Sequence, residues 1–329
     1  MKRFEIRLLF RILVTLATLA WFFSSVRPGS LLARLAGVRW WVAVPAFLVN
    51  AGWIFPSALR WRGIARLSGY GLTFMASLRY RVIGSFFNVF LPTGNGGDIV
   101  RGFLASRELG YPLGGILGTV LVDRIIGMMV SLGILIVAGF VLFSRALLPG
   151  NVLVSAAVLF LCASAAVLVL ASKKFRKAVK PLLEKSPLRS FHGGARNAAR
   201  VVDACWENPR GLGTAVLLSL ANQLITIASG YLTSLAIPDF NAPFYVFLLV
   251  MPLSFIAVLL PSIGGYGVRE AGFVLFFGWF GVPAEPVVVF GIIRMLFLWL
   301  FALIGGCVFI SGGRIRMKDI IPPDMKWIQ

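Results

Sequence analysis

The chain has 329 residues, of which 59% are hydrophobic, and a formal net charge of +20. Soluble domains are about 45–50% apolar, so this composition excludes an ordinary soluble protein and predicts an all-α integral membrane protein. In a soluble chain the positive charge would suggest nucleic-acid binding. Here we expect no nucleic-acid partner, because the charge can orient the protein in the membrane and contact anionic lipids. The three cysteines and one histidine show no disulfide or zinc spacing, so we expect no metal and no cofactor.

Apolar segments long enough to cross about 30 Å of hydrocarbon follow one another along the chain. They lie at 8–26, 40–58, 72–91, 113–143, 151–172, 211–237, 243–260, 263–280 and 286–311. The first lacks the small-residue cleavage site of a signal peptide, so we expect it to be retained. Residues 1–329 are predicted to form one polytopic transmembrane domain. A basic loop at 173–210, with ten Lys or Arg against three acids, is expected to contact anionic lipids of the inner leaflet.

Aromatic residues mark the expected membrane–water interfaces. The stretch "LLARLAGVRWW" (31–41) is predicted to lie along the outer surface of the membrane as an anchor. The indole rings of Trp40, Trp41, Trp53 and Trp61 are typical of the aromatic belts at these interfaces.

The stretch "LPTGNGGDIVRGF" (91–103) breaks an apolar run with a proline, glycines, an acid and an arginine. A complete crossing at this point would place the basic loop outside, against the positive-inside rule. A re-entrant segment near 72–106 instead leaves both termini, residues 59–81 and the loop in the cytoplasm. Of the 32 basic residues, 25 are then cytoplasmic and four lie outside, namely Arg27, Arg34, Arg39 and Arg145. We therefore predict a re-entrant helix pair here.

A second stretch, "FIAVLLPSIGGYGVREAGF" (255–273), repeats the pattern of the first. Each has an apolar run that ends in Leu-Pro, then a small hydroxyl residue, a Gly-Gly pair, and an arginine followed closely by phenylalanine. Three complete spans separate the copies, so the second re-entrant pair, near 243–280, is predicted to enter from the opposite face. Two such elements indicate an inverted repeat, and interrupted helices of this kind mark the binding site of many transporters near the midplane.

The two motifs contain residue types that suit an anionic headgroup. Proline ends a helix, glycine allows positive φ and close backbone approach, and free N–H groups at a helix start bind anions. Arginine binds phosphate through paired hydrogen bonds. The candidate substrate-binding residues of the motifs are Pro92, Thr93, Gly94, Asn95, Gly96, Gly97, Asp98, Arg101, Pro261, Ser262, Gly264, Gly265, Tyr266, Gly267, Arg269 and Glu270. For Asp98 and Glu270 two roles stay open: holding the arginines, or binding a cationic group or a proton.

Three further charged residues lie inside apolar segments, where charge is costly and is usually functional. Asp123 and Arg124 are neighbours in the segment 113–143, and Arg294 lies in the segment 286–311. Adjacent residues of a helix do not share a face, so Asp123 and Arg124 are each expected to pair with another element. Arg294 is expected to neutralise an acid or to face an anionic lipid.

The motif residues carry a resemblance to a known family. The stretches "PTGNGGDIVRGFLASRELG" (92–110), "VLVDRIIGMM" (120–129) and "PSIGGYGVREAGF" (261–273) resemble the flippase-like membrane domain of lysylphosphatidylglycerol synthases, which also occurs alone in many bacterial and archaeal proteins. The resemblance implies a helical fold with two re-entrant pairs and a role in moving lipids between leaflets. It also implies that Asp98, Arg101, Arg269 and Glu270 lie near the lipid path. The aminoacyl-transferase domain of the synthases is not expected, so lipid lysinylation is not expected either.

Three functions remain open on the sequence. The first is a lipid translocase of the cytoplasmic (inner) membrane, moving a phospholipid, glycolipid or polyprenyl-phosphate type of lipid, with no Walker motif, no catalytic residue and so no enzymatic activity. The second is a membrane enzyme acting on a lipid-linked phosphate or sugar. Such enzymes need positioned acids with a metal or histidine, and the acids at membrane depth are only Asp98, Asp123 and Glu270. The third is a lipid-binding partner of a separate biosynthetic enzyme. A homodimer is also compatible with the sequence.

Overall fold

A computed structural model of the chain describes residues 2–26, 28–90, 96–144, 161, 200–201, 203–205, 207–257, 262 and 265–311. These residues form helices joined by turns, with no strand among them, which confirms the predicted all-α class. The helices are α1 (Lys2–Ser24), α2 (Pro28–Ala36), α3 (Trp40–Ala51), α4 (Ile54–Leu67), α5 (Phe74–Phe90), α6 (Gly96–Leu109), α7 (Leu113–Ser144), α11 (Pro209–Leu235), α12 (Phe244–Ala257), α13 (Val268–Gly278) and α14 (Ala284–Ser311).

Four helical stretches are long and apolar enough to cross a membrane, which confirms a polytopic protein. They are Trp40–Leu67, formed by α3 and α4 together, and the helices α7, α11 and α14. Helices α1 and α2 form a fifth candidate that bends by 80° at the break between them. The predicted span at 151–172 lies outside the described residues, except for Leu161, as does most of the basic loop 173–210.

Helices α5 and α6 form an antiparallel hairpin, as predicted for the first re-entrant pair. Close to the turn, the Gly97 N–H donates to Asn88 Oδ1 at 2.9 Å. At the open side of the hairpin, Arg79 forms an ion pair of 3.2 Å with Glu108. The hairpin opens where Gly71 N–H donates to the Tyr111 hydroxyl at 3.0 Å. We call this end of the bundle, formed by residues 67–73, 109–113 and 208–211, the proximal end.

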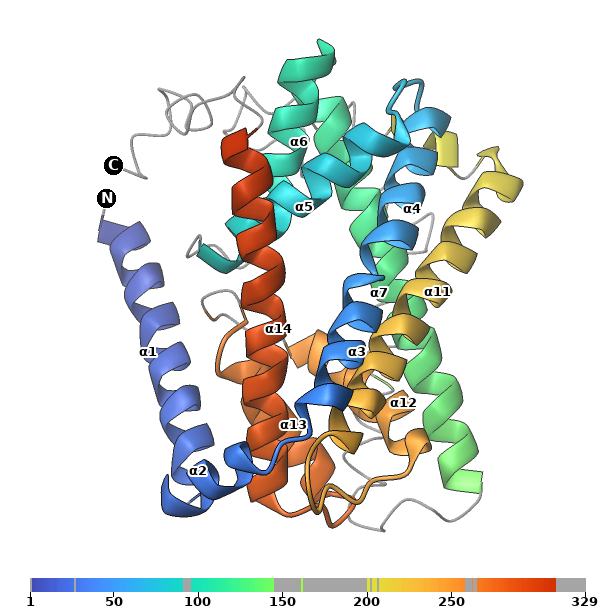
Figure 1. Ribbon diagram of the computed structural model, residues 1–329. Helices are drawn as coiled ribbons and strands as arrows, with labels where there is room; N and C mark the ends of the chain where they lie inside the picture. Colours follow the sequence, from blue (N-terminus) through green and yellow to red (C-terminus); the bar gives the residue numbers. More distant parts are fainter. Residues whose placement is uncertain are drawn as a thin grey trace.

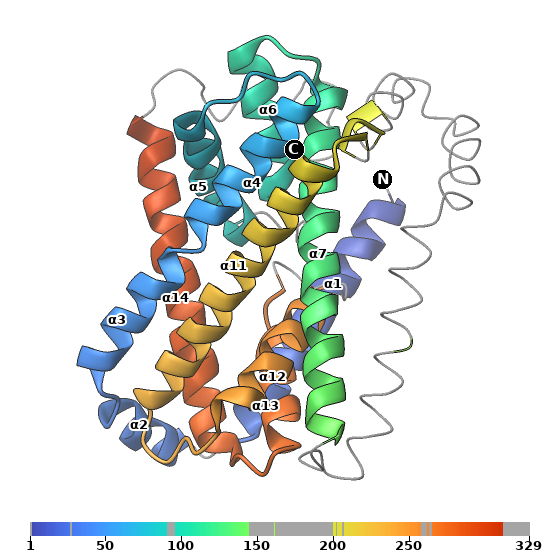
Figure 2. The same ribbon diagram turned by 90° about the vertical axis from the view of Figure 1, so that its right-hand side faces the viewer.

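Helices α12 and α13 form the second hairpin, in which the rings of Phe247 and Phe277 lie 5.1 Å apart. It opens at the other end of the bundle, formed by residues 34–39, 236–243 and 278–284, which we call the distal end. There Arg39 N–H donates to the Ala236 carbonyl at 2.8 Å, and Arg34 pairs with Asp239 at 3.1 Å. Figures 1 and 2 show α5 and α6 in one half of the bundle and α12 and α13 in the other. The two hairpins therefore open at opposite ends, while their relation as an inverted repeat stays a prediction.

Long helices connect the two halves. Helix α14 packs along α5, where a methyl group at Gly305 would come within 2.2 Å of the Val82 carbonyl oxygen. Helix α11 begins at the proximal end with a regular cap, in which Asn208 Oδ1 accepts the Gly211 N–H at 2.9 Å and Pro209 occupies the first turn. Helix α11 then runs the length of the bundle to the distal end, so it connects the half that contains the first hairpin to the half that contains the second.

Candidate functional site

A buried carboxylate in the proximal half binds charged side chains from three other helices. Asp123 of α7 is only 1% exposed. It accepts a hydrogen bond from Arg60 Nε of α4 at 2.7 Å, one from Arg101 Nη2 of α6 at 3.1 Å, and one from Arg81 Nη2 of α5. Arg60 also donates to the Ser219 hydroxyl of α11 at 2.7 Å. The four helices of the proximal half and α11 are thereby joined through one acid.

A second acid lies beside this group. Asp98, in the first turn of α6, contacts Arg101 Nε at 3.0 Å and accepts a hydrogen bond from Arg124 Nη1 at 2.7 Å. The Asp98 side chain is 23% exposed, whereas those of Arg101 and Asp123 are almost completely buried. We call the six side chains together the arginine layer; its members are Arg60, Arg81, Arg101, Arg124, Asp98 and Asp123.

Helix register explains why these side chains meet at one depth. Arg60 lies seven residues before the end of α4, and Arg81 seven residues after the start of α5. Arg101 lies eight residues before the end of α6, and Asp123 ten residues after the start of α7. At a rise of 1.5 Å per residue, each lies about 10–15 Å from the proximal end. Four helices whose ends meet at the proximal end therefore carry charge to the same level inside the bundle.

The arginine layer carries more positive than negative charge. Arg60, Arg81 and Arg101 surround Asp123, and Asp98 is shared between Arg101 and Arg124. Arg81 Nε and Arg101 Nη1 are buried and have no hydrogen-bond partner among the described residues. Burying a charge or a polar donor without a partner costs free energy. A bound anion would supply the hydrogen-bond acceptors that these two guanidinium donors lack.

The aromatic ring of Trp61 packs against one side of the arginine layer. The guanidinium carbon of Arg101 lies 4.8 Å from the centre of the Trp61 ring, in reach of a cation–π interaction. Trp61 is fully buried and its Nε1–H donates to the Thr119 hydroxyl at 3.0 Å. The prediction that Trp61 belongs to an interface belt is therefore wrong. Trp61 shares the buried face of α4 with Ala58 and Ala65, so this ring faces the inside of the bundle.

The structure confirms that Asp123 and Arg124 each pair with another helix: Asp123 pairs with α4, α5 and α6, and Arg124 pairs with α6. Two members of the layer were not predicted as site residues. Arg60 and Arg81 were assigned with residues 59–81 to the cytoplasm, whereas both are buried. The available signal was helical periodicity, because Arg60 shares a buried stripe with Ser57 and Ile64, and Arg81 with Ser77.

The first glycine motif serves helix packing. Gly96 and Gly97 begin α6, and a methyl group at Gly97 would come within 1.8 Å of the Gly84 carbonyl oxygen. The Gly97 N–H, expected to be free for an anion, is already bonded to Asn88 Oδ1. The unpartnered donors are therefore those of the arginines, not this backbone N–H. The predicted site residues Pro92, Thr93, Gly94 and Asn95 lie outside the described residues.

The second motif begins α13 with its own capping carboxylate. Gly265 and Gly267 have positive φ, as glycine allows. Glu270 is fully buried, accepts the Gly267 N–H at 2.8 Å through Oε2, and pairs with Arg269 Nε at 3.1 Å through Oε1. Because the carboxylate occupies the start of the helix, a ligand anion would meet Arg269 rather than this backbone N–H. Pro261 and Gly264 lie outside the described part of the chain.

The remaining predicted residues gather around this motif in the distal half. Arg294 Nη1 donates to the Ser229 hydroxyl at 2.8 Å, and the Tyr266 hydroxyl accepts Trp299 Nε1–H at 2.8 Å. Ser262 Oγ and Arg269 Nη2 are buried without a hydrogen-bond partner in the described part of the chain. Arg294 lies ten residues into α14 from the distal end, about 15 Å inside the bundle. The structure thus separates the predicted site residues into two groups, one in each half.

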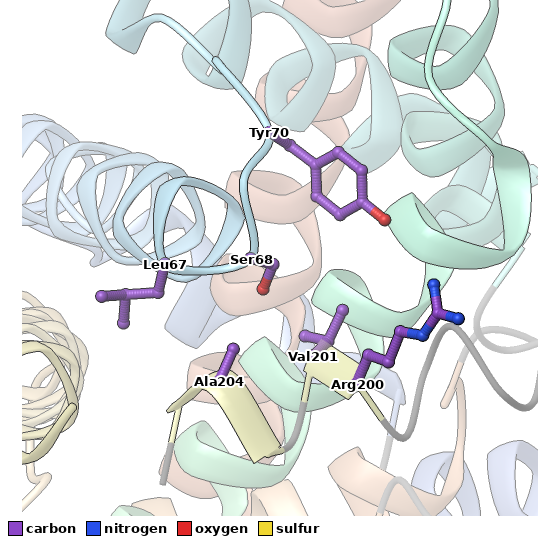
Figure 3. Close-up of a pocket in the computed structure, with 6 residues that line it drawn as sticks. All are labelled: Leu67, Ser68, Tyr70, Arg200, Val201 and Ala204. Carbon is purple, nitrogen blue, oxygen red and sulfur yellow. The ribbon is translucent and has the colours of Figure 1, made fainter. Parts of the chain in front are cut away.

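A cavity of about 250 Å³ opens at the proximal end (Figure 3). It is lined by Leu67, Ser68, Tyr70, Arg200, Val201 and Ala204. Its one charged lining residue, Arg200, is exposed, so the cavity adds no buried ligand group to the site. Within the described ranges, no group of three or more His, Cys, Asp or Glu side chains could hold a metal ion.

Several helices are long enough to cross a membrane, the two hairpins open at opposite ends, and a charged layer lies between the helices. These features define a polytopic membrane protein with an ionic site inside its bundle. The chain belongs to the family described as the lysylphosphatidylglycerol synthase TM region, whose model matches residues 8–306. No curated protein matches the chain. Membership of this family indicates a function related to membrane lipids.

Proposed function

We propose that the protein is a lipid translocase, which moves a lipid with an anionic or phosphate-bearing headgroup between the leaflets of the cytoplasmic membrane. In this proposal it changes the position of the lipid and not its chemistry. The proximal end and both chain termini lie in the cytoplasm, because the first helix and the segment 173–210 are rich in Lys and Arg.

The observation that carries the proposal is the excess of buried positive charge in the arginine layer. Charged side chains at membrane depth are rare and usually mark a substrate or ion pathway. In the layer, Arg81 Nε and Arg101 Nη1 lack partners although they are buried. Guanidinium donors bind phosphate oxygens through charge-assisted hydrogen bonds. A lipid headgroup would supply the missing acceptors.

The two hairpins support a path with two stations. The arginine layer lies next to the α5–α6 hairpin, and Arg269 and Arg294 lie next to the α12–α13 hairpin. Along helices of 28 to 32 residues, the two groups are on the order of 15 Å apart at 1.5 Å per residue. A headgroup could pass from one group to the other while the hairpins alternately open and close, as interrupted helices do in other transporters.

The test is lipid transfer in vesicles reconstituted with the purified full chain. Fluorescent phosphatidylglycerol in the outer leaflet is quenched chemically, and the loss of accessible signal reports exchange. Arg101→Gln and Arg269→Gln should each reduce the rate of exchange at least about tenfold, as expected for one lost charge-assisted hydrogen bond. Arg66→Gln, at an exposed position in the last turn of α4, is the control and should transfer at the wild-type rate. Wild-type rates in both motif variants would refute the proposal.

A further inference from the structure

We infer that the headgroup recognised by the arginine layer ends in a dianionic phosphate group, a phosphomonoester or a diphosphate, rather than in a monoanionic phosphodiester. The inference rests on the proposed function and narrows its substrate class. It is carried by the charge balance of the layer and by the two unpartnered guanidinium donors.

The charge balance is uneven by two. Asp98 lies closest to Arg124, with the carboxylate and guanidinium 2.7 Å apart, so these two charges offset each other. Arg60, Arg81 and Arg101 then face Asp123 alone. Three positive charges against one negative charge leave two uncompensated charges among side chains that are more than nine-tenths buried. Buried charge is tolerated when it is paired, and a dianion would complete the pairing.

Neighbouring charges do not remove this excess. Toward the proximal end, Glu108 is occupied by Arg79 and by the Tyr80 hydroxyl, which donates to it at 2.7 Å. In the other direction, Glu270 is occupied by Arg269 and the Gly267 N–H. Each of these acids already has a partner outside the layer. The two positive charges are therefore available to a ligand.

The unpartnered donors also fit a terminal phosphate. Arg81 Nε and Arg101 Nη1 come from two different helices and belong to guanidinium groups that meet at the same Asp123 oxygen. A terminal phosphate carries three acceptor oxygens and a charge of about −1.5 to −2 at pH 7. It can therefore accept from both donors at once and keep an oxygen for a third contact.

The surroundings favour a lipid over free phosphate. Next to the partly exposed Asp98–Arg124 pair, the side chains of Ile99 and Leu121 are about half exposed. Leu121 lies three residues before Arg124, on the same side of α7. An acyl or polyprenyl chain could lie over these apolar side chains while its phosphate reaches the layer. Free phosphate would gain nothing from them.

The experiment measures binding, so that it does not depend on transport. The full chain in dodecyl maltoside at pH 8 is titrated with dioleoyl phosphatidic acid, dioleoyl phosphatidylglycerol or dioleoyl phosphatidylcholine, and a separate arm receives inorganic phosphate. Bound lipid is counted by native mass spectrometry. We expect phosphatidic acid to bind at least about tenfold more tightly than phosphatidylglycerol, the effect of one further charge-assisted hydrogen bond, and inorganic phosphate to leave phosphatidic acid binding unchanged at equal concentration.

Variants of Arg81 test whether the preference for phosphatidic acid over phosphatidylglycerol arises in the arginine layer. Arg81→Gln removes one of the two excess charges and should lower the preference for phosphatidic acid to less than about threefold, whereas Arg81→Lys keeps the charge and most of the preference. Arg79→Gln, two residues earlier on α5 in the pair with Glu108, is the matched control and should keep the wild-type preference.

Each outcome separates this inference from the proposed function. Equal binding of phosphatidic acid and phosphatidylglycerol by the wild type overturns the dianion inference whatever the variants do. If inorganic phosphate displaces phosphatidic acid at equal concentration, the claim that the phosphate group belongs to a lipid is overturned. An unchanged preference in Arg81→Gln overturns the assignment to the layer. A clear preference in binding, combined with no exchange of either fluorescent phosphatidylglycerol or fluorescent phosphatidic acid in vesicles, leaves the inference intact and refutes the translocase.

Discussion

Asp123→Asn is the substitution with the largest expected effect on stability. The amide keeps the shape of the carboxylate but removes the negative charge that Arg60, Arg81 and Arg101 share. Three guanidinium groups would then meet in a buried space, and neither Arg60 nor Arg81 would keep an ion-pair partner among the described residues. Loss of one partner from a buried ion pair typically costs about 3–5 kcal/mol, and here one carboxylate serves three partners.

The loss of stability expected for Asp123→Asn can be compared with the loss expected for the same change in a neighbouring acid. Asp98 is 23% exposed and pairs mainly with Arg124, so Asp98→Asn should cost about 1 kcal/mol or less because water can replace the carboxylate. In the double variant Asp123→Asn/Arg81→Gln, one of the mutually repelling charges is gone, and stability should partly return. The difference between the double variant and the sum of the single variants measures the coupling.

Reversible unfolding in mixed micelles of dodecyl maltoside and sodium dodecyl sulfate, followed by tryptophan fluorescence, measures these free energies. Trp61, which lies against Arg101, is one of the nine tryptophans that contribute to this signal. Equal stability of Asp123→Asn and the wild type would refute the reasoning, since it would mean that the arginines do not depend on Asp123. A loss no larger than that of Asp98→Asn would refute the claim that burial sets the size of the effect.

Three further predictions concern packing and reactivity. Gly97→Ala should separate α5 from α6 and lower the melting temperature, because its methyl group would come within 1.8 Å of the Gly84 carbonyl oxygen. Gly267→Ala should also be destabilising, since φ is +77° there and the methyl group would lie 2.2 Å from Thr18 Oγ1 of α1. Cys205, which precedes α11, should react slowly with maleimide at pH 7, because it is buried and burial raises the pKa of its thiol.

Each of these three predictions has a control on the same chain. Gly133→Ala in α7, where nothing lies within 4 Å of the added methyl group, should leave the melting temperature unchanged or raise it slightly. If Gly97→Ala or Gly267→Ala behaved in the same way, the close contacts at those positions would not exist. Thiol reactivity after unfolding in detergent gives the reference for Cys205, and fast labelling of the Cys205 peptide, distinguished from exposed Cys307 by peptide mapping, would show that it is accessible.

The membrane fold could be predicted from the sequence because its main cause acts locally. A helix of about 20 apolar residues satisfies its own backbone hydrogen bonds and can cross the bilayer without help from distant residues. The long helices α7, α11 and α14 therefore appear where the apolar segments predicted them. The break between α5 and α6 was also predictable, because a proline followed closely by three glycines disfavours continuation of the helix.

The roles of single residues were harder to predict from the sequence than the membrane fold. The glycines of the first motif were expected to approach a ligand, yet Gly97 approaches Gly84 of the neighbouring helix. Nothing in the local sequence distinguishes these two uses of glycine, because both need only the absence of a side chain. The acids Asp98 and Glu270 were correctly placed beside Arg101 and Arg269, since these neighbours lie within one helical turn.

The sequence by itself determined that this is an all-α membrane protein, where its long spans lie, and that charges inside them need partners on other helices. Only the tertiary structure decided which partners these are. Arg60, Arg81 and Arg101 are 63, 42 and 22 residues away from Asp123 in the chain, and they meet because four helices end at the same side of the bundle. Sequence patterns report the face of one helix, whereas charge balance is a property of the space between helices.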